Sequence, residues 1–336
     1  MKKVLKSLLL LSLMVLLFIS CGKKNEEVVA QKPVVVTSNY PIYDFVEKIA
    51  KDTVEVINII PPGAEPHDWE PTAKDITLFE KADLFVYNGA GMEPWAEDVL
   101  ESLSNKNLKT LVTSSNVDLI RNEEDEEHDH DHDHEHHHHH HHHHDDHDHD
   151  EHDHEHHHHH HGEYDPHIWL SLKNADIISK SIKDKLIEIN PDKAEFYEEN
   201  YKEFSKELAA LDEKYTKELA EFKGRNIVVA HEAFAYLCRD YGLNQLGIEG
   251  VFAESEPTPK KMKEIVDYVK ANNVKVIFFE SLASPKVAEA IARETGAETD
   301  MLNPIEGLTE SEIASGKDYL SIMEDNLSSL KKALSK

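Results

Sequence analysis

The stretch from Asn190 to Phe222 places the strongest constraint on the fold of this chain. It begins with Asn190-Pro191-Asp192, a capping side chain followed by a proline in the first helical turn, and no glycine interrupts it before Gly224. At ~1.5 Å per residue such a helix spans roughly 45 Å, which is longer than a small domain is wide. Its larger apolar side chains recur mostly at steps of three and four, at Phe196, Tyr197, Tyr201, Phe204, Leu208, Leu211, Tyr215 and Leu219. Because this spacing keeps no strict heptad, it favours a rigid linker between two domains over a coiled-coil strand.

Short apolar segments alternate with helical segments on both sides of this helix. Before it, the pattern predicts strands at Val34–Thr37, Val54–Ile60, Leu84–Tyr87 and Leu108–Val112, and helices at Tyr43–Ala50, Asp75–Ala82 and Pro94–Ser104. After it, the pattern restarts with strands at Ile227–Ala230, Asn244–Ile248, Val274–Phe279 and Glu298–Leu302, and helices at Glu232–Tyr241, Pro259–Asn272, Pro285–Thr295 and Lys317–Leu334. Such alternation is typical of parallel sheets with both faces covered.

The sequence therefore predicts an α/β fold of two similar lobes with mainly parallel sheets, joined by one long rigid helix. We expect an N-terminal lobe at residues 33–170, a helical segment at 171–223 that includes the linking helix, and a C-terminal lobe at 224–336. A clamshell built in this way should permit only limited hinge motion.

The N-terminus has the pattern of an export signal. Residues 1–20 combine a basic start with an apolar run from Leu8 to Ile19, which is too short for an ordinary spanning helix. Cys21 follows directly and resembles the cleavage site of a bacterial lipoprotein, although Phe18 stands where Leu or Val is usual. The resemblance implies a lipidated Cys21, a tether at residues 21–32 and a protein held at a membrane face. The alternative is an ordinary signal with a chance cysteine.

The net charge of −30 is concentrated in one segment. Residues 123–163 hold 17 acidic residues and no Lys or Arg, so the rest of the chain carries −13. This balance argues against nucleic acid as a partner and suits metal cations.

Within that segment, residues 123–162 alternate His with Asp and Glu and have no apolar residue, which predicts a disordered loop near the cleft entrance. We interpret the loop as a collector of weakly held metal cations or, alternatively, as a solvated insertion.

Polar side chains that bind metals stand at the carboxyl ends of the predicted strands, where open parallel sheets bind ligands. Outside the His-rich loop the chain has three histidines, and each lies in a loop or at a strand end: His67, His167 and His231. Glu280 directly follows the strand Val274–Phe279. Three imidazoles and one carboxylate make a four-coordinate set that suits Zn²⁺.

Four motifs together resemble the metal-binding solute-binding proteins of ATP-binding-cassette importers, the zinc/manganese class with a rigid linking helix. The motifs occur in the same order as in that family and lie at Pro62–Thr72, Asp165–Leu170, His231–Phe234 and Phe279–Ser281. The resemblance implies a clamshell of the periplasmic-binding-protein type and a metal held between the lobes by His67, His167, His231 and Glu280. Glu65 or a water molecule is an alternative fourth ligand. A histidine in third place is the zinc-type pattern.

The resemblance implies an exported, lipid-anchored protein that captures Zn²⁺ and delivers it to a membrane permease with its ATPase. We expect a monomer. The same scaffold carrying Mn²⁺ or Fe²⁺ is one alternative, and a zinc storage or buffering lipoprotein that works through the His-rich loop is another. An enzyme is not expected, because His231-Glu232-Ala233-Phe234-Ala235 begins like the zinc-protease pattern H-E-x-x-H but has Ala235 where the second histidine is required.

Overall fold

The computed structural model describes residues 32–67, 69–122, 162–253 and 257–336. The predicted signal, Cys21 and the tether up to residue 31 lie outside the described residues, as does the His-rich loop except for Gly162. Residues 33–336 form one compact unit. Within the part of the chain that the structure describes, no helix combines the length and the apolar character needed to cross a membrane.

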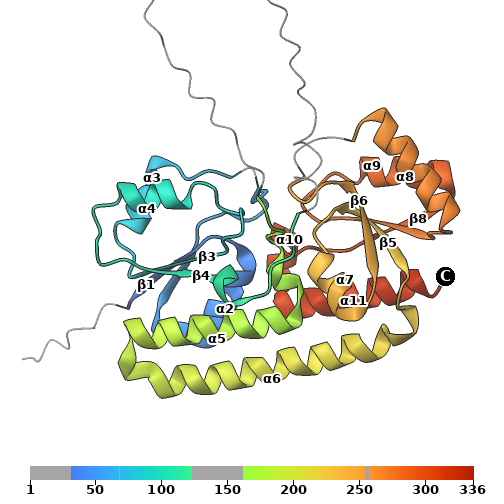
Figure 1. Cartoon of the computed structure of the whole chain (residues 1–336). Coiled ribbons are helices and arrows are strands. Elements are labelled where there is room, and N and C mark those ends of the chain that lie inside the picture. Colours follow the sequence, from blue (N-terminus) through green and yellow to red (C-terminus); the bar gives the residue numbers. More distant parts are fainter. Residues whose placement is uncertain (1–31, 68, 123–161, 254–256) are drawn as a thin grey trace, which may run out of the picture. The chain divides into compact units, whose positions relative to one another are not determined.

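The first sheet is fully parallel and has the strand order β2-β1-β3-β4. Its strands are β1 (Val34–Thr37), β2 (Glu55–Asn58), β3 (Leu84–Tyr87) and β4 (Lys109–Val112), and its helices are α2 (Tyr40–Ala50), α3 (Ala73–Phe79) and α4 (Ala96–Ser102). Successive side chains of a strand face opposite sides, so Val35 and Val36 enter two different cores. Helices α3 and α4 cover one face of the sheet, and α2 lies on the other (Figure 1).

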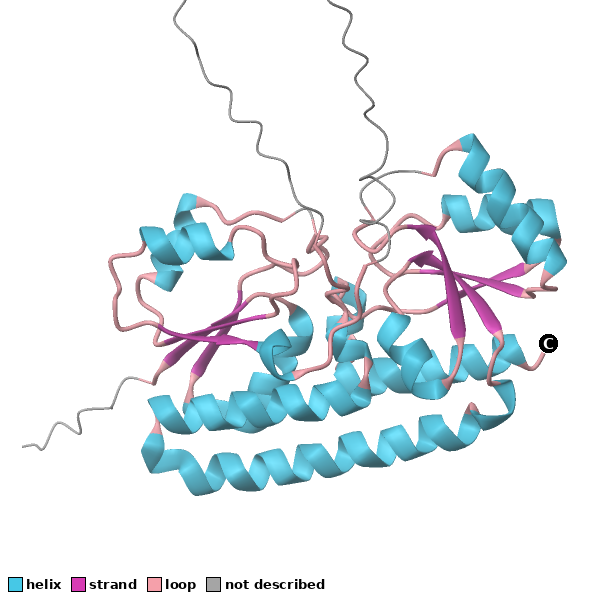
Figure 2. Cartoon of the chain, viewed as in Figure 1, coloured by secondary structure: helices cyan, strands magenta, loops and turns pink. Residues whose placement is uncertain are grey.

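The second sheet repeats the same relative order, β6-β5-β7-β8, and is also fully parallel (Figure 2). Its strands are β5 (Asn226–His231), β6 (Asn244–Glu249), β7 (Val276–Phe279) and β8 (Glu298–Met301). Its helices are α7 (Ala235–Tyr241), α8 (Pro259–Ala271), α9 (Lys286–Thr295), α10 (Glu310–Ala314) and α11 (Tyr319–Leu334). The prediction of two similar lobes with parallel sheets is confirmed. The short helix α10 was not predicted.

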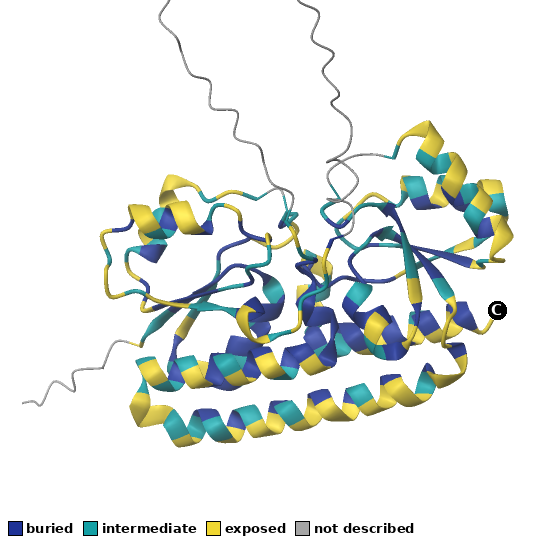
Figure 3. Ribbon diagram, in the orientation of Figure 1, coloured by how far each residue is buried: buried dark blue, intermediate teal, exposed yellow. Residues whose placement is uncertain are grey.

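A long helix joins the two sheets, as predicted. After α5 (Leu172–Ile189) a 3-10 turn at Pro191–Lys193 leads into α6, which runs for 25 residues from Ala194 to Glu218. Helix α6 packs on α2 and α5 beside the first sheet and on α11 beside the second. Its buried side chains lie on one face and are Tyr197, Asn200, Phe204, Leu208, Leu211 and Tyr215 (Figure 3). The spacing of three and four in the sequence thus marks the face that contacts both halves of the unit.

Two hydrogen bonds tie α6 to helices from both lobes. Asn200 donates its side-chain N–H to the carbonyl oxygen of Ile49 in α2 at 2.8 Å, and the Tyr215 hydroxyl donates to the carbonyl oxygen of Met323 in α11 at 2.6 Å. These bonds are buried, so separating α6 from either helix would leave unpaired polar groups.

The segment after β5 differs from the prediction. His231 still pairs with Glu249 as part of the strand, and the helix starts only at Ala235. Glu232 is therefore not a first-turn helix residue, and its carboxylate accepts a hydrogen bond from the backbone N–H of Gly247 at 3.1 Å. Cys238 lies in the apolar core on α7, and burial raises the pKa of its thiol well above the ordinary value.

A buried carboxyl group lies where α2 meets the start of α11. Asp44 is 7% exposed, and its Oδ1 accepts a hydrogen bond from the Tyr40 hydroxyl at 3.3 Å. The neighbouring ammonium group of Lys48 bonds to Asp318, the N-cap of α11, and the second oxygen of Asp44 finds no hydrogen-bond partner among the described residues. Burial therefore raises the pKa of Asp44 to about 7, although Lys48 opposes the shift.

We expect the Asp44→Asn variant to be more stable than the native chain above pH 7. A carboxyl group whose pKa is raised on folding keeps its proton in the folded state while the unfolded chain loses it, so native stability falls between about pH 4 and pH 7. The free energy of unfolding of the variant should exceed that of the native chain by at most about 4 kcal/mol at pH 8, and this difference should vanish near pH 4. Denaturant unfolding of the metal-free protein at both pH values measures this difference.

Asp318→Asn is the matched control and should destabilise the protein at pH 8, because hydrogen bonds from Lys48 and Ser321 lower the pKa of Asp318 against the effect of its burial. A difference between Asp44→Asn and the native chain that does not change with pH would contradict the prediction.

Candidate metal centre

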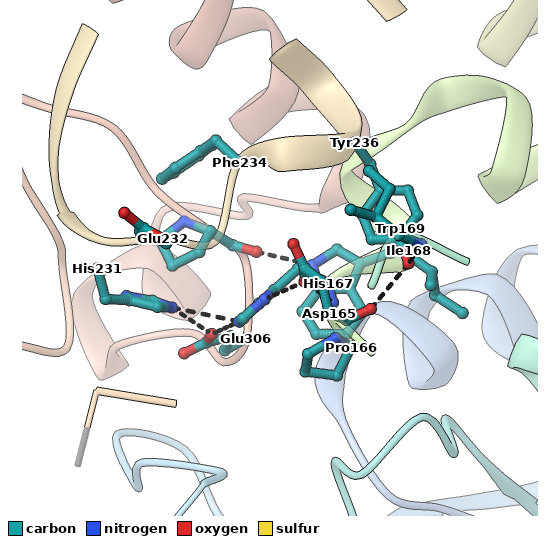
Figure 4. A network of polar contacts seen from close by, with 12 residues as sticks. Asp165, Pro166, His167, Ile168, Trp169, His231, Glu232, Phe234, Tyr236 and Glu306 are labelled. Atoms are coloured by element: carbon teal, nitrogen blue, oxygen red, sulfur yellow. Dashed lines mark hydrogen bonds and ion pairs between the residues drawn. The ribbon is translucent and has the colours of Figure 1, made fainter. Parts of the chain in front are cut away.

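The three predicted histidines meet at one point with a fourth residue, Glu306. The ligand atoms of His67, His167, His231 and Glu306 all lie within 4.8 Å of one another. Glu306 Oε1 lies 2.8 Å from the Nε2 of His167, 3.2 Å from that of His231 and 3.3 Å from that of His67. The Nε2 atom of His167 lies 3.3 Å from that of His67 and 3.2 Å from that of His231. Figure 4 shows His167 and His231 converging on Glu306.

The four residues come from both halves of the unit. His67 lies in the loop that follows β2, and His231 is the last residue of β5. His167 precedes a 3-10 turn at Ile168–Leu170 that leads into α5, and Glu306 lies in the loop after β8. A metal bound by all four would therefore connect segments that are more than 200 residues apart in the sequence.

His167 is held by local and distant hydrogen bonds. Asp165 Oδ1 accepts from the backbone N–H of His167 at 2.8 Å and from its Nδ1–H at 2.7 Å. The side chain of Asn88, directly after β3, donates to the carbonyl oxygen of Pro166 at 2.8 Å. From the second lobe, the Tyr236 hydroxyl on α7 donates to the carbonyl oxygen of Asp165 at 2.8 Å. These bonds anchor the segment on both lobes and leave Nε2 of His167 facing the cluster.

The structure does not place Glu280 in the cluster. Glu280 Oε1 accepts from the Nδ1–H of His231 at 2.8 Å and from its backbone N–H at 3.2 Å. It thus lies on the opposite side of the imidazole from Nε2, the nitrogen that faces the other ligands. The carboxylate that joins the three Nε2 atoms in the structure is that of Glu306 rather than that of the predicted Glu280, because strand β7 ends beside β5 and carries Glu280 behind the ring.

Glu306 lies in a loop that is buried throughout, from Leu302 to Leu308. The indole N–H of Trp169 donates to the carbonyl oxygen of Pro304 at 2.7 Å, and Ile305 has a positive φ of 62°. For a β-branched residue this backbone conformation is strained, so the surrounding contacts must hold the loop in place. The sequence signal for Glu306 was available: it lies in the loop after the last predicted strand, just as His67 lies in the loop after Val54–Ile60.

The carboxylate of Glu306 and the two buried imidazoles stabilise each other's charged forms. Burial alone would raise the pKa of Glu306, but His231, His67 and His167 hold it well below the usual range. Burial likewise opposes protonation of His231, yet Glu280 and Glu306 raise its pKa well above the ordinary value, and Asp165 and Glu306 raise that of His167. Near neutral pH the metal-free cluster therefore retains protons that an incoming cation must displace.

Glu65, the alternative ligand, lies beside the cluster rather than in it. Burial and the charge of Glu306 raise the pKa of Glu65 to about 8, so this carboxyl group holds a proton near neutral pH. Glu65 also lines a cavity of about 280 Å³ that reaches His231 and Glu280 and has Lys286 in its wall.

Aromatic rings pack against two of the ligands. The Trp169 ring lies 5.5 Å from that of His167. Trp69 packs on Trp95 at 5.4 Å within the first lobe. The ring of Phe252, which the sequence analysis did not identify, lies 5.6 Å from that of His67. The rings of Trp169 and Phe252 thus each pack against one imidazole of the cluster, whereas Trp69, among the described residues, does not.

Comparisons with known proteins agree with this geometry. The family described as "Zinc-uptake complex component A periplasmic" (ZnuA) matches residues 35–333. The chain belongs to this family. It is 38% identical to the zinc-binding lipoprotein AdcA of Streptococcus pneumoniae, over 98% of the chain but 61% of that protein's length. It is also 38% identical to the high-affinity zinc uptake system protein ZnuA of Bacillus subtilis, over 95% of the chain and 94% of that protein.

A solved structure with a similar fold carries zinc. The Zn(II)-bound ZnuA-like domain of S. pneumoniae AdcA aligns with a TM-score of 0.72 at 34% identity, and covers 91% of this chain and all of that domain. The family is one of uptake components that bind a solute, not one of enzymes. The sequence-based recognition of the family is confirmed.

Proposed function

We propose that this chain captures one Zn²⁺ ion between its lobes with His67, His167, His231 and Glu306 and delivers it for import. The single observation that carries the proposal is the convergence of three Nε2 atoms and one carboxylate from both lobes within 4.8 Å. Three neutral imidazoles and one carboxylate suit a tetrahedral zinc ion, and the carboxylate offsets part of its charge.

The partner that fits this role is an ATP-binding-cassette permease with its ATPase. Membership in a periplasmic uptake family supports an extracytoplasmic location, and the name of AdcA as a lipoprotein supports a lipid anchor at Cys21. We propose residues 1–20 as the signal peptide, 21–32 as the tether, and 33–170, 171–223 and 224–336 as first lobe, helical segment and second lobe of a monomer.

Storage through the His-rich loop is the competing function. Storage needs many weak sites, whereas delivery needs one tight site that is organised before the metal arrives. The buried imidazoles, two of which have carboxylate partners at Nδ1, favour delivery. We assign the His-rich loop the secondary role of collecting zinc near the site.

We expect the site to select zinc over manganese. Imidazole ligands favour Zn²⁺ over Mn²⁺ by ligand type and by the Irving–Williams order. Protein in which residues 123–161 are replaced by a short glycine-serine linker should retain about one zinc per chain after equilibration with both metals and desalting. Elemental analysis measures the ratio, and a His67→Ala variant of the same protein shows how much metal is held elsewhere. Recovery of mainly manganese would mean that the chain carries Mn²⁺ rather than Zn²⁺.

A further inference from the structure

We propose that Glu280 is a positioning residue for His231, one that raises the zinc affinity of the site without binding the metal. This inference rests on the proposed function, because it assigns a role within the same zinc site. It gives a function to a carboxylate that lies directly behind a ligand and does not belong to the ligand cluster.

The pairing of two neighbouring strands places Glu280 behind the ring. Strands β5 and β7 are parallel neighbours with Val228 opposite Ile277. His231 lies three residues after Val228, and Glu280 lies three residues after Ile277. The same register therefore brings His231 and Glu280 side by side at the carboxyl edge of the sheet. This edge is also where the strand order of the second lobe reverses, since β6 lies on one side of β5 and β7 on the other.

The contacts of Glu280 set both the tautomer and the orientation of His231. One carboxylate oxygen accepts from the ring Nδ1–H at 2.8 Å and from the backbone N–H of the same residue at 3.2 Å. With the proton held at Nδ1, the lone pair of the neutral ring is at Nε2, which faces Glu306 and His167. His231 is 3% exposed and Glu280 6%, so water does not compete strongly for either group.

The first lobe contains the same arrangement built from different elements. Asp165 accepts from the backbone N–H and from Nδ1–H of His167, at 2.8 and 2.7 Å. There the carboxylate precedes its histidine by two residues, whereas Glu280 follows His231 by 49 residues and comes from another strand. The same pair of contacts thus occurs in both lobes, on different local structures. This recurrence indicates that the shared role of the two carboxylates is to hold the imidazole, since a histidine that binds a metal gains basicity and a fixed direction from such a partner.

Three variants of the full chain test the role of Glu280. Glu280→Ala removes both hydrogen bonds. Glu280→Gln removes the charge but keeps an oxygen that can accept both. Glu249→Gln removes the same charge at the position opposite His231 on the other neighbouring strand, β6. The measurements are zinc affinity by competition with a chelator, the visible absorption of Co²⁺ added below one equivalent, and the melting temperature of the metal-free protein.

The expected result is a graded loss. Glu280→Ala should lower zinc affinity about 10- to 100-fold, Glu280→Gln less, and Glu249→Gln little. At saturation all three should keep the tetrahedral cobalt spectrum of the native protein, because the ligands remain in place. An unchanged affinity in Glu280→Ala would overturn the proposal. An equal loss in Ala and Gln together with an altered cobalt spectrum would overturn it in favour of Glu280 as a ligand. If the native protein itself showed no single tight zinc site, the proposed function would fail whatever the variants did.

Discussion

Zinc should raise the melting temperature of the native protein strongly, and His67→Ala or His231→Ala should remove most of that rise. An ion that binds only the folded state stabilises it by mass action, by about 4 kcal/mol when free zinc is 1,000 times the dissociation constant. For a unit of this size the shift is on the order of 10 °C. Each alanine removes one of the four proposed ligands, which come from both lobes. Calorimetry with and without zinc measures the shift.

The matched control for this experiment is replacement of residues 123–161 by a short linker. The residues that flank this segment lie close together, because the backbone N–H of Asn122 donates to the carbonyl oxygen of Glu163 at 2.9 Å. The replacement should lower the number of zinc ions bound in a titration and leave the thermal shift largely intact. His67→Ala and His231→Ala should instead keep most of the zinc ions bound by the His-rich loop and lose most of the thermal shift. If the replacement abolished the shift while the histidine variants kept it, storage in the His-rich loop would replace the proposed function.

The second large effect is expected from pH. The nearby carboxylates outweigh burial and raise the pKa of His231 and His167, so the metal-free site holds protons at neutral pH. Zinc needs the neutral imidazole and must release these protons. Its affinity should therefore keep rising above pH 7, beyond the range where an ordinary histidine has already lost its proton, by about tenfold per pH unit for each proton displaced.

Chelator competition between pH 6 and pH 9 measures this dependence in the variant whose residues 123–161 are replaced by the short glycine-serine linker. This variant has fewer histidines, which simplifies the titration. Calorimetric titration in buffers of different ionisation enthalpy counts the protons released. Affinity that levels off near pH 6.5 would mean that the imidazoles titrate like exposed ones and that Glu306 does not stabilise their protonated forms. Binding without proton release above pH 7 would lead to the same conclusion.

Much of this architecture could be predicted because it depends on local patterns. The strands Val34–Thr37 and Leu84–Tyr87 have the predicted bounds, since runs of β-branched and aromatic residues between turns have few alternatives. The uninterrupted run of helix formers around α6 required a long helix whatever its surroundings. The three histidines were identifiable because so few occur outside the His-rich loop and because each lies in a loop or at a strand end.

The choice between Glu280 and Glu306 required the tertiary structure. Both carboxylates follow a strand of the second sheet, and composition and spacing treat them alike. Strand register places Glu280 against Nδ1 of His231, while the buried loop after β8 turns back and brings Glu306 to the Nε2 atoms of three histidines. That loop depends on contacts with Trp169 and Asn326, which are remote in sequence. The sequence alone determined the two lobes, their linking helix and the imidazoles, whereas packing between distant segments decided which carboxylate joins the site and which one holds a ligand from behind.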